Sequence, residues 1–576
     1  MGFYKPYWKK YKKLYFLAVA CILCEVFCDL LQPTVMSRII DDGVTSGSIP
    51  VILRLGLLML CITAAGAGFA VSRNFLSSTV SQKFSADLRS DLYQKVISLP
   101  LSRVDEMGSG SIITRVTNDV VQVRQFVNGM MRFFLKGPAT GLGSIVLATV
   151  LCPQLSVVLL GAVALVSVFT AFSLKLSYHR YAKVQKAIDH VNTVVQEYLS
   201  GIRLVKTFGR FQEEEERFAA VNFDLADKNK AADRVISIFS PLMQLSINFG
   251  IVIVLFYGGF LFIHGSVQVG QIVAFTNYMT QILGAMRSIT NMFNTFVRTK
   301  ASSERITEIF RQQDAPSMPT AASHTKIPGY LVFDHVSFAY PNGSGAPVFH
   351  NLSFMVNRGE TLAVIGPTGS GKSTLCSLLI RFYDVTGGAI YLDGNDIRSI
   401  ETATLRQKIA IAPQQSMLFS GTIAENVRWG NTNATAEQVR RACEAAQADG
   451  FICEMPQQYN SLLGQGGVNI SGGQKQRISI ARALIRRAEL LLLDDCTSAL
   501  DAGTEAKVRH ALQKEKGKKT ILLVTQRIGT AMAADRILVL ENGKLAGLGS
   551  HSHLMHTCQT YRDIYDSQIG GEPYAE

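Results

Sequence analysis

Six apolar runs, each long enough to cross a lipid bilayer, occupy the first half of this 576-residue chain. A transmembrane helix needs about 20 consecutive, mostly apolar residues. Hydrophobic residues make up 48% of the sequence, and long stretches of them form these runs. The sequence therefore predicts a six-helix transmembrane domain over residues 1–298, with long polar loops at about 74–133 and 176–237. The predicted spans lie near residues 14–36, 51–73, 134–152, 155–175, 238–263 and 269–292.

The distribution of lysine predicts how the spans are oriented. Five lysines stand among aromatic residues in the first 13 positions, which suits a cytoplasmic segment at the membrane surface. The short loops between spans one and two, three and four, and five and six contain no lysine. We therefore expect the N-terminus and both long loops on the cytoplasmic side of the cell membrane. This topology accounts for the net charge of +13, so no nucleic-acid partner is expected.

Two carboxylates interrupt the first predicted span. Glu25 and Asp29 are four residues apart and share one face of a helix. Carboxylates inside a membrane are costly, and they usually face a cavity or a partner charge. Three interpretations stay open: a place on a substrate path that receives cations, a structural pairing with a basic residue of another span, and a protonated carboxyl group.

The second half of the chain has a different character. Residues 299–328 are polar and rich in helix-breaking residues, which predicts a linker. Residues 329–576 predict an α/β domain with a phosphate-binding loop between an apolar strand at 361–365 and a helix. Glycines in such a loop let backbone N–H groups close around phosphate oxygens, and the helix N-terminus favours the negative charge. The loop comprises Gly366, Pro367, Thr368, Gly369, Ser370, Gly371, Lys372, Ser373 and Thr374.

The loop and a later strand together predict an ATP site with Mg²⁺. Lys372 is expected to reach the β- and γ-phosphates, and Ser373 to ligate the metal. Asp494 ends the apolar run that starts at Leu490, and a carboxylate at that position holds the metal, usually through water.

The order and spacing of these segments resemble the nucleotide-binding domain of ABC transporters. The resemblance includes Ser471, Gly472, Gly473 and Gln474 before a helix, then Asp494 and Asp495, then Asp501, then Gln526. Six spans with two long inward loops resemble the transmembrane domain of ABC half-transporters of the exporter type. The expected fold class is therefore a multi-domain chain, in which a six-helix α-helical transmembrane domain is followed by an α/β P-loop nucleotide-binding domain.

The resemblance implies roles for individual residues. Tyr340 would stack on adenine, although a tyrosine that only fills the core is the alternative. Gln414 would contact the metal and report on the cytoplasmic loops, whose tips we place near 103–110 and 206–216. Ser471–Gln474 would close over the γ-phosphate held by a second nucleotide-binding domain. Asp501 would lie in the loop that spans the two ATP sites.

Two positions depart from the family pattern, which has Glu where Asp495 stands and His where Gln526 stands. The Asp495 side chain is one methylene shorter than Glu, with a similar intrinsic pKa, so its reach to an attacking water is reduced. Gln526 can donate a hydrogen bond but cannot become cationic. Taking Asp495, Gln526 and Gln414 as the catalytic residues, we expect a site that binds ATP and hydrolyses it slowly.

This combination resembles the degenerate-site subunit of heterodimeric ABC exporters. The expected partner is a non-identical half-transporter that carries the missing Glu and His. The resemblance further implies ATP-driven export of an amphiphilic small molecule, drug or lipid, in contact with membrane lipid. Two alternatives remain: a homodimer that hydrolyses ATP slowly at two equal sites, and an ATP-gated channel or regulatory membrane subunit.

Overall fold

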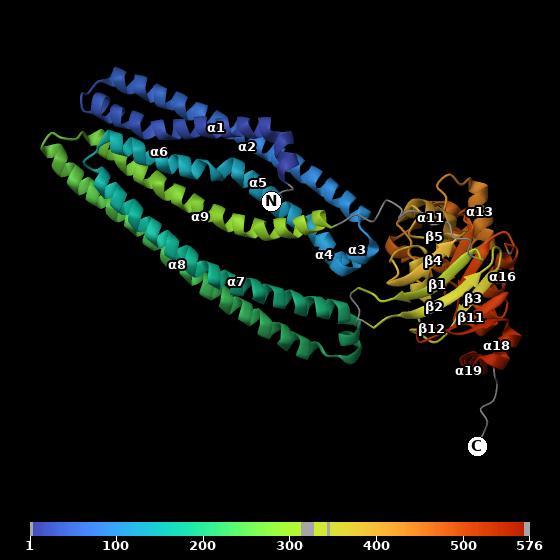
Figure 1. The fold of residues 1–576 in the computed structure, drawn as a ribbon. Coiled ribbons are helices and arrows are strands. Elements are labelled where there is room, and N and C mark those ends of the chain that lie inside the picture. The colour runs from blue at the N-terminus through green and yellow to red at the C-terminus, as the bar shows by residue number, and fades with distance from the viewer. Residues whose placement is uncertain (1–3, 313–327, 342–345, 516, 570–576) are drawn as a thin grey trace. The chain divides into compact units, whose positions relative to one another are not determined.

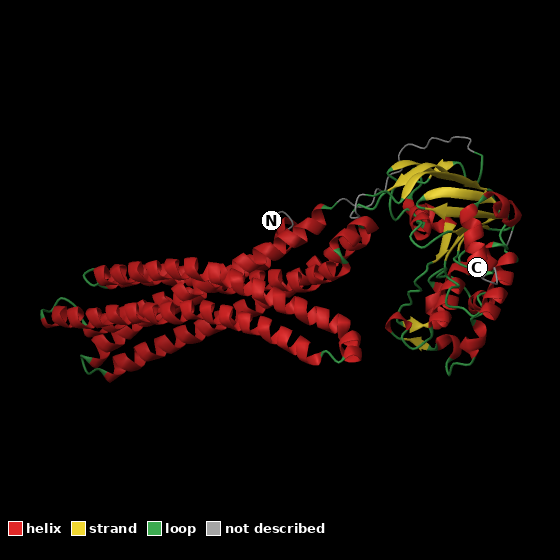
Figure 2. Ribbon diagram, turned by 90° about the horizontal axis from the view of Figure 1, so that it is seen from below, coloured by secondary structure: helices red, strands yellow, loops and turns green. Residues whose placement is uncertain are grey.

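The computed structural model describes residues 4–312, 328–341, 346–515 and 517–569 (Figure 1). The chain divides into two compact units. We call residues 1–97 and 110–312 the helical unit, and residues 98–109 and 313–576 the α/β unit. The predicted order of a helical domain followed by an α/β domain is confirmed. Figure 2 shows long helices in the first unit and all the strands in the second.

Six helices form most of the helical unit, and each overlaps one predicted span. They are α1 (Tyr4–Arg38), α2 (Ile49–Ser98), α6 (Lys136–Leu151), α7 (Ser156–Phe208), α8 (Phe211–Ile263) and α9 (Val269–Arg311). Within the described residues, five helical stretches are long and apolar enough to cross a membrane. The sixth predicted span lies in α9, which is more polar and includes Arg287.

The long cytoplasmic stretches predicted from the sequence are helical as well. The first contains α3 (Leu101–Met107), α4 (Ser109–Thr114) and α5 (Val120–Gly129), with π-helical turns at Arg115–Asp119 and Met130–Phe134. In the second, α7 and α8 meet at a turn formed by Gly209 and Arg210, with Gly209 at φ 65°. The tip expected near 206–216 is therefore this turn.

The helix α9 continues to Arg311, well into the range 299–328 that the sequence predicts to be a linker. Its hydroxyl residues are accommodated inside the helix, because Thr299 and Thr307 each donate to the carbonyl four residues earlier. Ser302 instead donates to Asp119 Oδ1 (2.9 Å), which is buried on a neighbouring helical segment. Residues 313–327 of the predicted linker lie outside the described residues.

Packing in the helical unit joins segments far apart in sequence. One buried cluster draws on α1, α7 and α9 and on the turn before α7, and it includes Ile22, Leu155, Leu159, Phe275, Tyr278 and Met279. The aromatic start of α1 packs along α2, where Tyr7 donates to Asp91 (2.6 Å) and Tyr11 donates to Asp87 (2.7 Å). These bonds hold the N-terminal lysine-rich segment on α2.

A six-stranded sheet forms the centre of the α/β unit, in the order β12-β11-β3-β10-β9-β6. All neighbouring pairs are parallel except β11 and β12. The strands are β3 (Thr361–Ile365), β6 (Ile409–Ala412), β9 (Leu490–Asp494), β10 (Thr520–Val524), β11 (Arg536–Glu541) and β12 (Lys544–Gly549). Parallel strands covered on both faces read as continuous apolar runs, which explains Leu490–Leu493.

A second, antiparallel sheet has the order β2-β1-β4-β5, and a two-residue pair joins β7 to β8. Their bounds are β1 (Leu331–Phe338), β2 (Phe349–Val356), β4 (Gly387–Leu392), β5 (Asn395–Asp396), β7 (Gly421–Thr422) and β8 (Leu462–Leu463). The helices are α10 (Lys372–Leu379), α11 (Thr402–Lys408), α12 (Ile423–Arg428), α13 (Ala436–Ala445), α14 (Asp449–Cys453), α15 (Gly472–Leu484), α16 (Ala502–Gln513), α17 (Ile528–Ala531), α18 (His551–Thr557) and α19 (Gln559–Gln568).

The central sheet separates two hydrophobic cores. Side chains alternate between the two faces of a strand, so Leu490 and Leu492 join the core that contains α10, while Leu491 and Leu493 join the core that contains α13 and α15. Because β3, β9 and β10 are parallel, the segments that follow them emerge at one edge of the sheet. This edge gathers the predicted ATP site.

Residues 98–109 belong to the α/β unit, although the chain on both sides of them belongs to the helical unit. The hydroxyl of Tyr383 donates to Asp105 on α3. Burial and this carboxylate raise the pKa of Tyr383. The tip of the first long loop, predicted near 103–110, is thus packed as part of the α/β unit.

Candidate functional site

The phosphate-binding loop connects β3 to α10 and depends on its glycines. Gly371 has φ 100°, a left-handed conformation that L-residues with side chains rarely adopt. A Cβ atom on Gly366 would lie 2.1 Å from the carbonyl oxygen of Leu540, so only glycine fits there. The loop therefore holds the backbone shape that exposes N–H groups to a phosphate.

Lys372 lies inside this loop. Its Nζ atom donates to the carbonyl oxygens of Gly366 and Pro367, at 2.8 Å each. The residue is 8% exposed, and this burial lowers the pKa of the ammonium group, while Asp495 and Asp494 act against the shift. The one buried cation of the loop is thus positioned where the phosphates of a nucleotide would bind.

Two of the three predicted metal ligands are in direct contact. Ser373 Oγ donates to Asp494 Oδ1 (3.1 Å), although the residues are 121 positions apart. Asp494 ends β9, and its burial raises the pKa of its carboxyl group. A hydroxyl and a carboxylate oxygen are ligands that Mg²⁺ accepts. This pair fits Mg²⁺, which such sites hold together with substrate phosphates.

The two departures from the family pattern also meet. Gln526 Nε2 donates to Asp495 Oδ2 at 3.0 Å. Asp495 follows β9 with φ 47°, and its backbone N–H donates to the carbonyl of Val524 (2.9 Å) at the end of β10. Burial raises the pKa of Asp495, and Lys372 opposes the shift. One oxygen of the candidate base is therefore occupied by the amide that replaces the expected histidine.

Tyr340 lies beside the helix that follows the loop. Its hydroxyl is 3.0 Å from Thr374 Oγ1, and its ring contacts Phe338 and Tyr383 edge-on, with centroids 4.9 Å and 5.2 Å away. The ring is partly buried against the core of the α/β unit. The structure brings Tyr340 to the loop, while stacking on adenine stays a prediction.

Gln414 is exposed, two residues beyond the end of β6. The strands β6 and β9 are parallel neighbours, so their ends lie side by side. Gln414 follows the end of β6, and Asp494 stands at the end of β9. Its contact with a metal ion stays a prediction.

Ser471 and Gln474 cap the start of α15. The Ser471 hydroxyl accepts from the Gln474 backbone N–H (3.3 Å), and the Gln474 side chain accepts from the Ser471 backbone N–H (2.9 Å). Ser471 and Gly472 are exposed, so this helix start is open to a second molecule. A Cβ atom on Gly473 would lie 2.9 Å from the carbonyl oxygen of Ala499, which brings this segment against the loop that ends at Asp501.

Asp501 is exposed and caps α16. Its Oδ1 atom accepts from the backbone N–H of Thr504 (2.9 Å), and this bond lowers the pKa of Asp501. The cap fixes the end of the loop at 498–501, while a role between two ATP sites stays a prediction.

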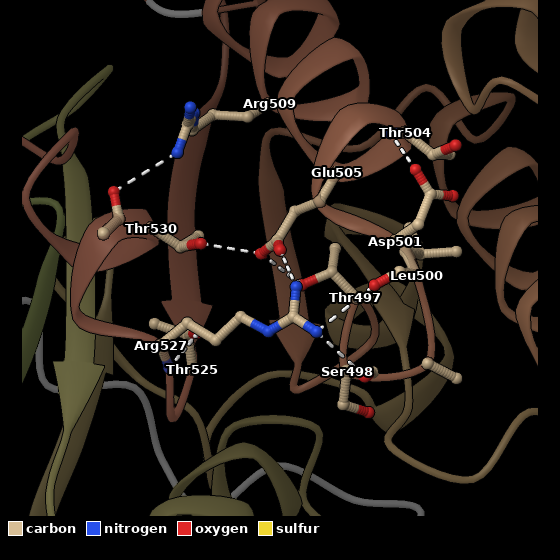
Figure 3. Close-up of polar contacts among 12 residues, drawn as sticks. Thr497, Ser498, Leu500, Asp501, Thr504, Glu505, Arg509, Thr525, Arg527 and Thr530 are labelled. Carbon is tan, nitrogen blue, oxygen red and sulfur yellow. Dashed lines mark hydrogen bonds and ion pairs between the residues drawn. The ribbon is translucent and has the colours of Figure 1, made fainter. Parts of the chain in front are cut away.

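Two residues beside the predicted site have no role predicted from the sequence. Glu505 is buried on α16, and Arg527 directly follows Gln526; the two form an ion pair (Figure 3). The only sequence signal was their position, since each lies one to four residues from a predicted site residue. Neither position alone predicts that they meet.

Glu25 and Asp29 are paired with cations. Lys136 Nζ lies 2.6 Å from Glu25 Oε1 and 3.0 Å from Asp29 Oδ2. Arg73 Nε lies 2.8 Å from Glu25 Oε2, and Glu25 is only 4% exposed. This geometry favours structural pairing for Glu25. Asp29, Arg73 and Lys136 also line a cavity of about 370 Å³, so a role of Asp29 on a substrate path stays a prediction.

Comparison with known proteins gives consistent matches over both units. Residues 15–286 match the family model described as ABC transporter transmembrane region, and residues 349–498 match the one described as ABC transporter. The uncharacterized ABC transporter ATP-binding protein YfiB of Bacillus subtilis is 39% identical over 99% of this chain and 98% of its own length. The ATP-dependent lipid A-core flippase of Sodalis glossinidius is 30% identical over 96% of this chain and 95% of its own. A solved structure of a bacterial Atm1-family ABC exporter with ATP bound has a TM-score of 0.83 and 25% identity, and the match covers 98% of this chain and 99% of that one.

Proposed function

The chain belongs to the ABC transporter family, as a half-transporter of the exporter type, and from this premise we propose that it is the degenerate-site subunit of a heterodimeric exporter. Members of the family are membrane proteins with several spans that act as dimers, and their nucleotide-binding domain is an ATPase coupled to transport. The proposal concerns which ATP site this chain builds, what partner it needs and what it exports.

The contact between Gln526 and Asp495 carries the proposal. A general base needs an oxygen that faces the attacking water, and geometry decides this before pKa does. Asp495 is shorter than the usual Glu, and the Gln526 amide occupies its Oδ2 atom. Gln526 is always neutral, whereas the family's histidine can be cationic when it contacts the γ-phosphate. The two substitutions therefore support slow hydrolysis as a matched pair.

By contrast with the hydrolytic residues, every residue that we assign to nucleotide binding is of the type that the family pattern has. Lys372 provides the buried cation of the loop, and Ser373 and Asp494 would hold Mg²⁺. When bound, Mg²⁺ neutralises the negative charge that develops on the phosphates. Tyr340 would stack on adenine, and Gln414 would contact the metal. This chain thus binds ATP at its own loop and keeps it over many cycles.

The exposed start of α15 has a second role in this proposal. Ser471–Gln474 would complete the ATP site of the partner, a non-identical half-transporter that carries the Glu and His missing here. Asp501 would lie in the loop between the two sites. ATP binding would draw the two domains together and favour an outward-open state, and hydrolysis at the partner's site would reset them.

The proposed cargo is an amphiphilic small molecule, drug or lipid. Two observations support this class: a relative named ATP-dependent lipid A-core flippase is 30% identical to this chain, and a cavity in the helical unit has both charged and apolar lining. The proposed setting is the cell membrane, with the N-terminus and the nucleotide-binding domain in the cytoplasm. Lysine placement supports this orientation.

The test compares ATP turnover of the purified chain alone and after co-expression and co-purification with its partner. We expect little turnover from the chain alone, and strong turnover from the complex. In the chain alone, D495E combined with Q526H should raise turnover by about tenfold or more, since a well-placed general base contributes that much. K372A in the same background should abolish the gain, because it removes the phosphate contact.

Fast hydrolysis by a purified assembly of two identical copies would contradict the proposal. Slow hydrolysis by such an assembly, with no partner recovered, would favour the homodimer alternative. Vesicles that accumulate cargo against a gradient would exclude the ATP-gated channel.

A further inference from the structure

Four segments of the α/β unit meet at the buried carboxylate of Glu505 (Figure 3). Glu505 lies in the first turn of α16 and is 6% exposed. Its Oε1 atom accepts from Thr530 Oγ1 (2.6 Å) and Thr497 Oγ1 (3.1 Å), and its Oε2 atom accepts from Arg527 Nη1. A buried carboxylate is costly unless it is paired and hydrogen-bonded, and here both oxygens are.

Arg527 extends this contact to the loop at 498–501. Its Nη2 atom donates to the carbonyl oxygens of Ser498 and Leu500, at 3.2 Å each. Its backbone N–H donates to Thr525 Oγ1 (3.1 Å), which fixes the start of its own loop. The planar guanidinium fork suits such simultaneous contacts, which a lysine cannot reproduce.

A second set of bonds joins the same loop to the base and to α15. Ser498 Oγ donates to the carbonyl of Asp495 (3.0 Å) and accepts from Gln476 Nε2 (3.1 Å). Gln476, buried on α15, also accepts from the backbone N–H of Ala499 (2.9 Å). The candidate base, the loop at 498–501 and the helix that starts at Ser471 are thus linked.

We propose that the Glu505–Arg527 pair is a positioning element, which sets the separation of the loop bearing Gln526 from the loop bearing Asp495 and Asp501. Thr497 is two residues from Asp495, and Arg527 is adjacent to Gln526, so one carboxylate fixes both sides of the hydrolytic site. The pair has no contact with Lys372, Ser373 or Asp494 among the described hydrogen bonds. It therefore governs turnover and leaves the grip on ATP intact. In a homodimer the pair acts on the chain's own site, and in the proposed heterodimer it acts on the partner's site through the loop at 498–501, whose Ser498 and Leu500 carbonyls Arg527 binds.

The first test is E505Q in the assembled transporter, purified from membranes in the dimer that it forms. Glutamine keeps the shape of Glu505 but removes the charge that holds Arg527. We expect kcat for ATP to fall by about tenfold or more, because small misplacements of reacting groups are that costly. The KM for ATP should change by less than about threefold, since uniform binding is untouched. An unchanged kcat would overturn the proposal.

The second test separates positioning from stability. R527Q leaves Glu505 buried without its cation, so the thermal unfolding temperature should drop. E505Q combined with R527Q removes both charges, so that no uncompensated charge stays buried. We expect the double variant to regain the unfolding temperature while kcat stays low. Recovery of kcat together with stability would show that the pair only stabilises the fold.

The control is Arg509, which lies on the same helix. Its Nη1 atom donates to the carbonyl of Gly529 (3.2 Å), close to Thr530 but away from the loop at 498–501 (Figure 3). We expect R509Q to keep kcat within about twofold of the original, as is usual for substitutions outside special contacts. A loss of kcat as large as that of E505Q would also overturn the proposal. All values are ratios to the unchanged assembly.

Discussion

At the scale of single residues, the predicted ATP site brings its assigned residues together in two groups. Lys372 is buried in the loop and Ser373 contacts Asp494, whereas Asp495 and Gln526 bind each other. The hydrogen bond explains why the two substitutions are compatible with each other. A histidine at 526 would present a ring N–H in place of the amide, and a glutamate at 495 would carry its carboxylate one methylene further.

Asp495 should also make stability depend on pH. Burial raises its pKa in the folded chain, so folding favours the protonated form. The destabilisation is absent below the ordinary pKa of an aspartate, near 3.9, and develops as pH rises through the raised value in the folded state. D495N keeps an acceptor for Gln526 and removes the charge. We expect it to raise the thermal unfolding temperature at pH 8 more than at pH 5, measured without nucleotide.

The matched control is D501N, because Asp501 is exposed and its pKa is lowered by the bond from Thr504. This substitution should lower the unfolding temperature at neutral pH or leave it unchanged. Equal gains from D495N at both pH values would show that burial of the charge is not the cause.

The binding half of the site could be predicted from the sequence, and the network around Glu505 could not. The motif determines the backbone of a glycine loop between a strand and a helix, and with it the positions of Lys372 and Ser373. Glu505 and Arg527 lie 22 residues apart, and their meeting depends on how the loops after β9 and β10 pack. A Glu in the first turn of a helix is common, because its negative charge interacts favourably with the positive end of the helix dipole.

At the scale of elements, the helical unit is held together below the spans by a charged contact between η2 (Arg115–Asp119) and α9. Asp119 Oδ2 accepts from Arg305 Nε (2.8 Å), and Asp119 Oδ1 accepts from Ser302 (2.9 Å). The Asp119 side chain is 3% exposed and that of Arg305 is 47% exposed, so the two partners are unequal.

This inequality predicts an asymmetric pair of substitutions. R305A leaves a buried carboxylate without its cation and should cost about 3 kcal/mol of unfolding free energy. D119A leaves an arginine that can turn to water and should cost about 1–2 kcal/mol. Denaturant unfolding of the detergent-solubilised protein would measure both. K228A, which removes an exposed pair with Asp224, should cost less than about 1 kcal/mol.

Equal losses for R305A and D119A would show that burial does not set the cost. The same contact explains why the first part of the range 299–328 is helical, although its composition predicts a linker. Serines and threonines normally favour turns, but here Ser302 binds Asp119 and Thr299 binds its own helix. Tertiary contacts of this kind leave no mark on local composition.

At the scale of the whole molecule, transport should depend on the charged cavity of the helical unit. Glu25 is enclosed by Arg73 and Lys136, whereas Asp29 shares Lys136 and borders the cavity. We therefore expect D29N to lower ATP-driven uptake of a cationic amphiphile into inverted vesicles several-fold, with an unchanged unfolding temperature.

E25Q is the comparison for D29N. It should destabilise the protein by about 3 kcal/mol, because it leaves the buried Arg73 without its carboxylate. Unchanged uptake by D29N would remove Asp29 from the substrate path and leave structural pairing as its role. Five of the six predicted spans have the length and apolar content of a membrane helix within the described residues, but the pairing of Glu25 with two other helices needed the tertiary structure.

The inclusion of residues 98–109 in the α/β unit has a consequence for protein engineering. A chimaera that joins this ATPase module to the spans of another exporter would normally be cut once, near the end of α9. Such a cut would leave α3, with Asp105 as the acceptor for Tyr383, on the wrong side of the graft. The transplantable piece is discontinuous in sequence, so a working exchange has to carry both segments.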